Sequence, residues 1–141
     1  MNRLALFNVS ADIITIFIAF IAIIAGQKTS TTFGFAAGIF SGLVSGNMGL
    51  SMLSRTIEGL VAGYFHISED NHPTTRQINT RFFSATVISG FCANAVMDTG
   101  YNPLGLPFLH RIVVLGLAES FFTLILAVIL HWLFLKKALV N

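Results

Sequence analysis

Long apolar stretches separated by short polar segments make up most of this 141-residue chain. The first stretch covers about residues 6–26, and residues 13–25 are wholly apolar except for Thr15. This length is close to the roughly 20 residues that an α-helix needs to cross the hydrocarbon core of a bilayer. Because the stretch is longer than the core of a signal peptide and contains Asp12, we predict a retained membrane helix.

Two shorter apolar pieces follow a polar link at residues 27–32. They cover residues 33–46 and 50–65 and are separated by the sequence Asn47-Met48-Gly49. At about 1.5 Å per residue, a helix of either length covers only about 20–25 Å. We predict two short helices joined by a tight turn; the alternative is a single long helix with a break.

The second half of the chain alternates in the same way. Residues 66–81 form its longest polar segment and predict a solvated loop, after which residues 82–97 predict a fourth helix. A loop with proline turn signals covers residues 98–107, and residues 112–135 predict a fifth helix.

Composition agrees with a membrane location. Only 10% of the residues are charged, whereas about a quarter are charged in a typical soluble domain. We therefore predict one integral membrane domain over residues 1–141, an all-α, polytopic helix bundle with about five transmembrane helices, two of them short and glycine-rich. The basic residues do not cluster with aromatic residues on a polar face, so nucleic-acid binding is not expected.

The distribution of basic residues predicts the orientation. Five crossings place the N-terminus and the loops at residues 47–49 and 98–111 on one side, and the remaining segments on the other. Because Lys and Arg concentrate on the cytoplasmic side, we predict an outer N-terminus and a cytoplasmic C-terminus. The outer side carries Arg3 and Arg111, and the inner side carries Lys28, Arg76, Arg81, Lys136 and Lys137.

Glycines recur every four residues on two of the predicted helices. Residues four apart share one face of a helix, and small residues on that face allow two helices to approach closely in a bilayer. We expect this face to pack against the third or fifth helix of the chain itself; the alternative is a contact with a partner protein. The glycines are Gly34, Gly38, Gly42 and Gly46 on the second helix, and Gly59 and Gly63 on the third.

Several polar residues lie inside the apolar segments and are functional candidates, because each must face protein or water instead of lipid. Arg55 and Glu58 are three residues apart, which suits an ion pair on one helix face. This pair either lies near the membrane surface or serves partner docking or substrate contact. Glu119 is expected to form a hydrogen bond with a neighbouring helix, and Asn94 lies within the fourth helix.

The histidines give no catalytic or metal-binding pattern. No two of them have the spacing of a metal site, and no Ser/His/Asp arrangement stands out, so we predict no enzymatic activity and no cofactor. His131 lies beside Trp132 near the end of the last helix. We expect a hydrogen-bonded residue at the membrane interface; the alternative is a ligand to haem iron or chlorophyll magnesium.

A series of short motifs runs through the glycine-rich segment. Phe33-Gly34-Phe35-Ala36-Ala37-Gly38 is followed by Leu43-Val44-Ser45-Gly46, by Gly49-Leu50 with Leu53, and by a helix that ends Gly63-Tyr64. These motifs resemble the hallmark region of the MreD family of rod shape-determining proteins, and the similarity covers about residues 6–66. The chain departs from the family in several features: Gly42 replaces an acidic residue before Leu43, the turn is one residue shorter, and Ser10-Ala11 stands where a proline is common. We also expect the chain to begin at the family's second helix.

The resemblance implies a non-catalytic scaffold in the bacterial inner membrane. Proteins of this family organise cell-wall elongation and rod shape together with MreC, MreB, RodA and a class B penicillin-binding protein. The glycine-bearing helices and the face with Arg55 and Glu58 are then expected to be contact surfaces.

Two other functions remain open. One is a small-molecule binding subunit of a vitamin-type importer, in which Arg55, Glu58, Asn94 and Glu119 hold the ligand. The other is an accessory subunit of a pigment- or haem-bearing complex that uses His131.

Overall fold

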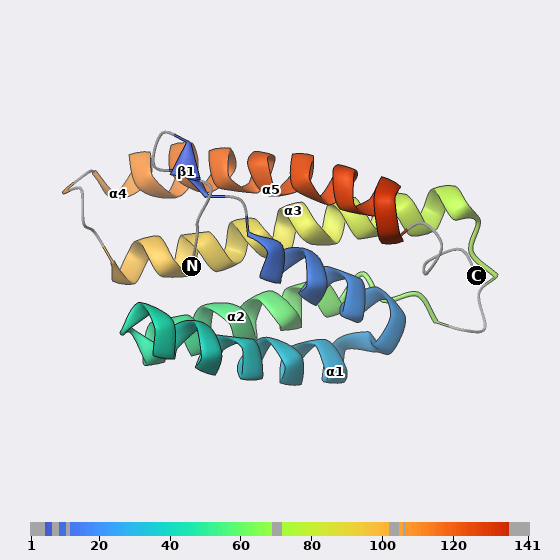
Figure 1. The fold of residues 1–141 in the computed structure, drawn as a ribbon, viewed down its shortest axis with the longest axis horizontal. Helices are drawn as coiled ribbons and strands as arrows, with labels where there is room; N and C mark the ends of the chain where they lie inside the picture. The colour runs from blue at the N-terminus through green and yellow to red at the C-terminus, as the bar shows by residue number, and fades with distance from the viewer. Residues whose placement is uncertain are drawn as a thin grey trace.

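The computed structural model describes residues 5–6, 9–10, 12–68, 72–101, 105 and 107–135. Nearly all of these residues are helical (Figure 1). Within them, the strands are β1 (Ala5–Leu6) and β2 (Val9–Ser10), which pair antiparallel. The predicted all-α fold is therefore confirmed apart from this short ladder.

The first helix, α1 (Ile13–Ser45), is broken at Gly26. This residue has φ 82° and ψ −179°, a conformation that only glycine adopts without a steric cost. Figure 1 shows the chain reversing direction there, so α1 consists of a first arm, residues 13–25, and a second arm, residues 27–45.

The first arm ends at Gly26 as predicted, but its start and the segment that follows it differ from the sequence prediction. The helix begins at Ile13 instead of residue 6, because the side chain of Asp12 accepts a hydrogen bond from the Ile14 backbone N–H at 3.0 Å and caps it. The predicted link at residues 27–32 is helical. Its polar side chains do not interrupt the helix, because Thr31 and Thr32 donate to the carbonyls four residues earlier at 2.7 and 2.9 Å.

A tight turn connects α1 to α2 (Met48–Gly63). Gly46 has φ 75°, and its backbone N–H donates to the carbonyl of Gly42 at 2.9 Å, which ends α1 in the left-handed conformation common at helix C-termini. The prediction of two helices joined by a turn is confirmed, and the single broken helix is excluded for this part of the chain.

The next helix, α3 (Thr75–Gly100), begins earlier than predicted. Thr74 and Gln77 form a capping box, in which each side chain bonds the backbone of the other residue. The polar residues 75–81, predicted as loop, are therefore the solvated first turns of this helix.

The last helical region is continuous although it changes type. It consists of α4 (Phe108–His110), the π-helix η1 (Arg111–Leu115), α5 (Gly116–Leu130) and the π-helix η2 (His131–Leu135). It confirms the predicted fifth helix and begins a few residues before it. The two lysines predicted to follow it lie outside the described residues.

The helices form a bundle in two layers (Figure 1). The second arm of α1 lies beside α2, α2 contacts α3, and α3 contacts α5. The first arm fits between the layers, where Ile16 and Ala19 pack against Phe82 of α3 and Ala127 of α5. The α1–α2 turn, the end of α3 and the start of α4 lie at one end of the bundle, and the Gly26 break lies at the other.

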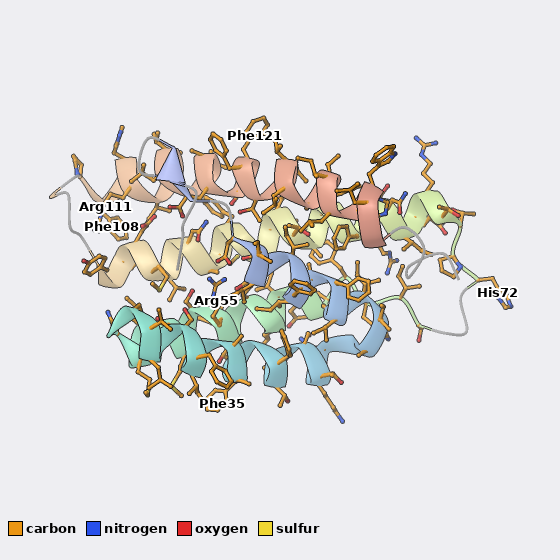
Figure 2. The ribbon with its side chains drawn as sticks, in the orientation of Figure 1. Phe35, Arg55, His72, Phe108, Arg111 and Phe121 are labelled. Atoms are coloured by element: carbon orange, nitrogen blue, oxygen red, sulfur yellow. The ribbon has the colours of Figure 1, made fainter. Side chains whose placement is uncertain are left out.

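Small and polar residues fill the interior, whereas large apolar residues face outward. Ser30, Ser54, Thr86 and Ser89 are at most 1% exposed, but Phe40 is 72% exposed. Figure 2 shows Phe35 and Phe121 projecting from opposite outer faces of the bundle. By length and apolar composition, the candidate membrane-spanning segments are Ile13–Ser45 and Phe108–Leu133, although the first reverses direction at Gly26.

Candidate functional site

Glycines bring the second arm of α1 and α2 into close contact. A Cβ added to Gly38 would lie 2.6 Å from the Met52 Cα, and one added to Gly63 would lie 2.5 Å from the Gln27 Cα. These distances are shorter than van der Waals contact, so a residue with a side chain does not fit. We call this contact the glycine seam; it also includes Gly34, Gly42 and Gly59.

Gly46 was predicted to belong to this face and does not. A Cβ on Gly46 would meet nothing within 4 Å, because the chain has already turned toward α2. The residue serves the turn through its positive φ instead.

A cluster of charged side chains joins α2 to the first arm of α1. Arg55 of α2 donates to Glu58 Oε2 at 2.7 Å and to Thr15 Oγ1 at 3.2 Å, and it forms an ion pair with Asp12. Figure 2 shows Arg55 between the two layers. We call Asp12, Thr15, Arg55 and Glu58 the ion cluster.

The ion cluster is deep in the bundle. The Glu58 side chain is fully buried, and those of Arg55 and Asp12 are 15% and 22% exposed. Arg55 lies eight residues after Asn47, which is about 12 Å along the helix from the turn. The predicted pairing of Arg55 with Glu58 is confirmed, and the depth of this pair in a membrane stays a prediction.

Asp12 is the member of the ion cluster whose role the sequence did not reveal. Its carboxylate both caps the first arm and pairs with Arg55, which is 43 residues away in sequence. Its backbone N–H donates to Thr123 Oγ1 of α5 at 3.2 Å. Asp12 thus links α1, α2 and α5 at one point. The sequence shows an acidic residue at the start of an apolar run, but the pairing of Asp12 with Arg55 depends on the reversal of the chain at Gly26.

The other two predicted polar residues lie on α3 and α5. Asn94 is half-buried on α3, next to Ala93, whose carbonyl accepts from Ser54 at 2.9 Å. Glu119 is half-buried on α5, one turn before Thr123. Its expected bond to a neighbouring helix stays a prediction, as does the hypothesis that these two residues form one ligand site with Arg55 and Glu58.

His131 is packed inside the bundle near the end of α5. It is 8% exposed, its Nε2 donates to Asn79 Oδ1 at 2.9 Å, and its ring lies 5.3 Å from that of Phe83. A haem or chlorophyll bound through Nε2 would have to break this hydrogen bond. The geometry favours a structural role within the bundle.

His66 closes the break in α1. Its Nδ1 lies 2.9 Å from the carbonyl oxygen of Ile23, so Nδ1 carries the proton and donates. Ile23 is one of the last four residues of the first arm, whose carbonyls lack an intrahelical partner at a helix end. The ring also lies against Gly26, where a Cβ would be 3.5 Å away. No local sequence pattern indicates this contact.

A second charged pair lies at the end of the bundle beyond the predicted fourth span. Arg111 is 6% exposed and donates to the carbonyl of Tyr101 at 3.2 Å. Burial raises the pKa of Asp98, and the nearby Arg111 opposes this shift.

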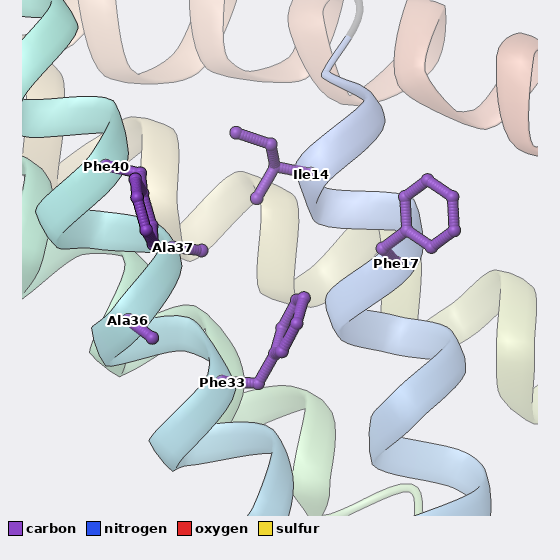
Figure 3. A pocket seen from close by; sticks show the side chains of 6 residues that line it. All are labelled: Ile14, Phe17, Phe33, Ala36, Ala37 and Phe40. Atoms are coloured by element: carbon purple, nitrogen blue, oxygen red, sulfur yellow. The ribbon is translucent and has the colours of Figure 1, made fainter.

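The two arms of α1 enclose an apolar groove (Figure 3). Its volume is about 290 Å³. No polar side chain lines it, and Figure 3 shows Phe33 directed into the space between the arms. The lining residues are Ile14, Phe17, Phe33, Ala36, Ala37 and Phe40.

In the described part of the chain, the buried Arg55 pairs with the carboxylates of Glu58 and Asp12. Among the described residues, no three His, Cys, Asp or Glu side chains are grouped to hold a metal ion. Neither a family model, nor a curated protein, nor a solved structure matches this chain.

Proposed function

We propose that this chain is a polytopic membrane protein with five crossings, formed by the two arms of α1 and by α2, α3 and α5. The outward-facing phenylalanines and the small, polar interior support this proposal. Water would disfavour such an exterior, whereas lipid accepts it. The first arm has 13 residues and is about 20 Å long. It is shorter than the roughly 30 Å hydrocarbon core, so Asp12 lies at membrane depth.

The same proposal includes location and orientation. The chain resides in a bacterial inner membrane with its C-terminus in the cytoplasm. Basic residues are in excess around the Gly26 break and the start of α3 at Thr75, which supports this orientation.

Within that membrane, we propose a non-catalytic scaffold that resembles MreD and organises cell-wall elongation through helix contacts. One observation carries this proposal. The segment that resembles MreD uses its glycines and its buried charges for contacts within the chain, in the glycine seam and the ion cluster. The segment thus builds a rigid helical unit whose remaining outer faces are apolar.

This arrangement changes where partners are expected to bind. The glycines of the seam are already covered by the facing helix, so they are not available to another protein. Partners such as an MreC-like protein, a RodA-like protein or a penicillin-binding protein would instead contact outer faces, for example those around Phe35 and Phe121.

Photo-cross-linking in the native membrane tests this proposal. A photoreactive amino acid replaces Phe35 or Phe121 in the full chain, and the matched control carries it at Val44, which is also exposed at 65% but lies beside the turn. We expect an adduct with an elongation protein from at least one of the first two positions and a weaker adduct, or none, from Val44. Adducts with an importer's ATPase-bearing module instead would contradict the scaffold proposal.

The importer and pigment alternatives receive less support from the geometry. An importer subunit needs a pocket with polar groups that fix its ligand. The groove between the α1 arms has no polar lining. Arg55 pairs with Glu58 and Asp12 and does not line this groove.

A further inference from the structure

The ion cluster contains two carboxylates and one guanidinium. Asp12 and Arg55 are the charged groups that act on Glu58, and the cluster therefore carries one excess negative charge when both acids are ionised. An uncompensated charge is costly in a region from which water is excluded. This imbalance concerns the interior of the bundle and does not depend on the scaffold proposal.

One oxygen of the Glu58 carboxylate lacks a well-formed hydrogen bond. Oε2 accepts from Arg55 and the Thr15 hydroxyl also lies near the carboxylate, but Oε1 is buried and has no partner with hydrogen-bond geometry in the described part of the chain. An ionised carboxylate has about four acceptor positions, and a buried acceptor without a partner costs about 1–3 kcal/mol.

Ser89 of α3 presents a second unused polar atom. Its Oγ is buried and also lacks a partner among the described residues. Ser54 of α2 donates to the carbonyl of Ala93, and α2 and α3 run in opposite directions (Figure 1). Glu58 lies one turn after Ser54 on α2, and Ser89 lies one turn before Ala93 on α3. Because Ser54 contacts Ala93 and the two helices are antiparallel, Glu58 and Ser89 lie at the same level of the bundle. Two buried unpartnered atoms on neighbouring helices thus share one layer.

We propose that this layer is a proton-binding site, in which Glu58 takes up one proton on Oε1 with the Ser89 hydroxyl as its hydrogen-bond partner, directly or through one water. The proton comes from solvent and forms the new O–H bond, and no other covalent bond changes. The cluster then becomes neutral. Charged groups face Glu58 from α1, as Asp12, and from its own helix, as Arg55, whereas the facing α3 residue is the uncharged Ser89.

Proton uptake has a structural consequence. With Glu58 ionised, Arg55 is shared by two carboxylates; with Glu58 protonated, its full charge is directed at Asp12. Because Asp12 caps α1 and its N–H bonds Thr123 of α5, protonation strengthens the connection between the start of α1 and two other helices.

Infrared spectroscopy of the purified full chain tests this proposal. The carbonyl stretch of a protonated carboxyl group is recorded across a pH series. Wild-type protein with ¹³C-carboxyl glutamate is compared with protein carrying labelled aspartate. We expect a band at neutral pH that shifts with labelled glutamate only and is lost in Glu58→Gln. The matched control, Glu119→Gln, should keep it.

Three outcomes would overturn the proposal. They are the absence of a glutamate carbonyl band at neutral pH, a band that persists in Glu58→Gln, and a band lost only in Glu119→Gln. Ser89→Ala provides a second test if Glu58→Gln does not fold. We expect the wild-type band to shift in Ser89→Ala, because its hydrogen bond is lost; an unshifted band would remove Ser89 from the site.

Discussion

A methyl group at Gly38 is the smallest change that tests the glycine seam. Its Cβ would lie 2.6 Å from the Met52 Cα and 3.0 Å from the Ser51 carbonyl oxygen. Ordinary van der Waals contact begins at 3.4 Å. Both obstacles are backbone atoms that cannot rotate away, so Gly38→Ala forces the two helices apart.

The expected magnitude follows from two opposing terms. Ala in place of Gly favours a helix interior by about 1 kcal/mol, whereas overpacking a closely packed contact costs about 1–3 kcal/mol and occasionally more. Separating the helices also weakens the other close contacts of the seam, such as that of Gly42 with Met48. We expect a net loss of about 1–3 kcal/mol in the free energy of unfolding.

Gly49→Ala is the matched control. Gly49 lies in α2, has no positive φ, and has nothing within 4 Å of its added Cβ. The same chemical change should therefore leave stability unchanged or raise it by up to about 1 kcal/mol.

Reversible unfolding in detergent micelles, followed by circular dichroism, measures both variants under the same conditions. We predict that Gly38→Ala is clearly less stable than Gly49→Ala, although the chemical change is the same. Equal stability of Gly38→Ala and Gly49→Ala would refute the close contact between α1 and α2.

Three further predictions concern charged and polar contacts. Glu58→Ala should lower the free energy of unfolding by about 1–3 kcal/mol, because Arg55 loses a buried hydrogen-bond partner but keeps its ion pair with Asp12; a melting curve like that of wild type would contradict this. His66→Ala should cost about 1 kcal/mol and speed hydrogen exchange around Gly26, because the Ile23 carbonyl loses its donor; unchanged exchange would exclude the capping role. Because burial raises the pKa of Asp98, wild-type stability should fall as pH rises through that pKa, and Asp98→Asn should abolish the fall in a pH series of melting temperatures.

The apolar pattern predicted the helices well but not their ends. Polar segments were assigned to loops, although residues 27–32 and 75–81 are helical. Threonines in the first segment satisfy carbonyls of their own helix, and Thr74 with Gln77 caps the second. At the end of a bundle, polar side chains reach solvent without leaving the helix, so polarity alone did not mark a boundary.

The ion cluster was predictable only in part. The i, i+3 spacing indicated that Arg55 and Glu58 pair, because this contact lies within one helix. The contact of Arg55 with Asp12 depends on the reversal at Gly26, which no local pattern specifies. The glycine face was likewise visible as a spacing, and one of its two expected occupants, the third predicted helix, is confirmed as α2; only the exclusion of Gly46 follows from the tight turn.

Purification from the native membrane in mild detergent, with identification of every co-purifying protein, tests the central claim most directly. A membrane scaffold of wall elongation should be recovered with an MreC-like protein or with wall-synthesis enzymes, and without bound colour. Recovery with a transporter ATPase module or with pigment-bearing subunits would contradict the account.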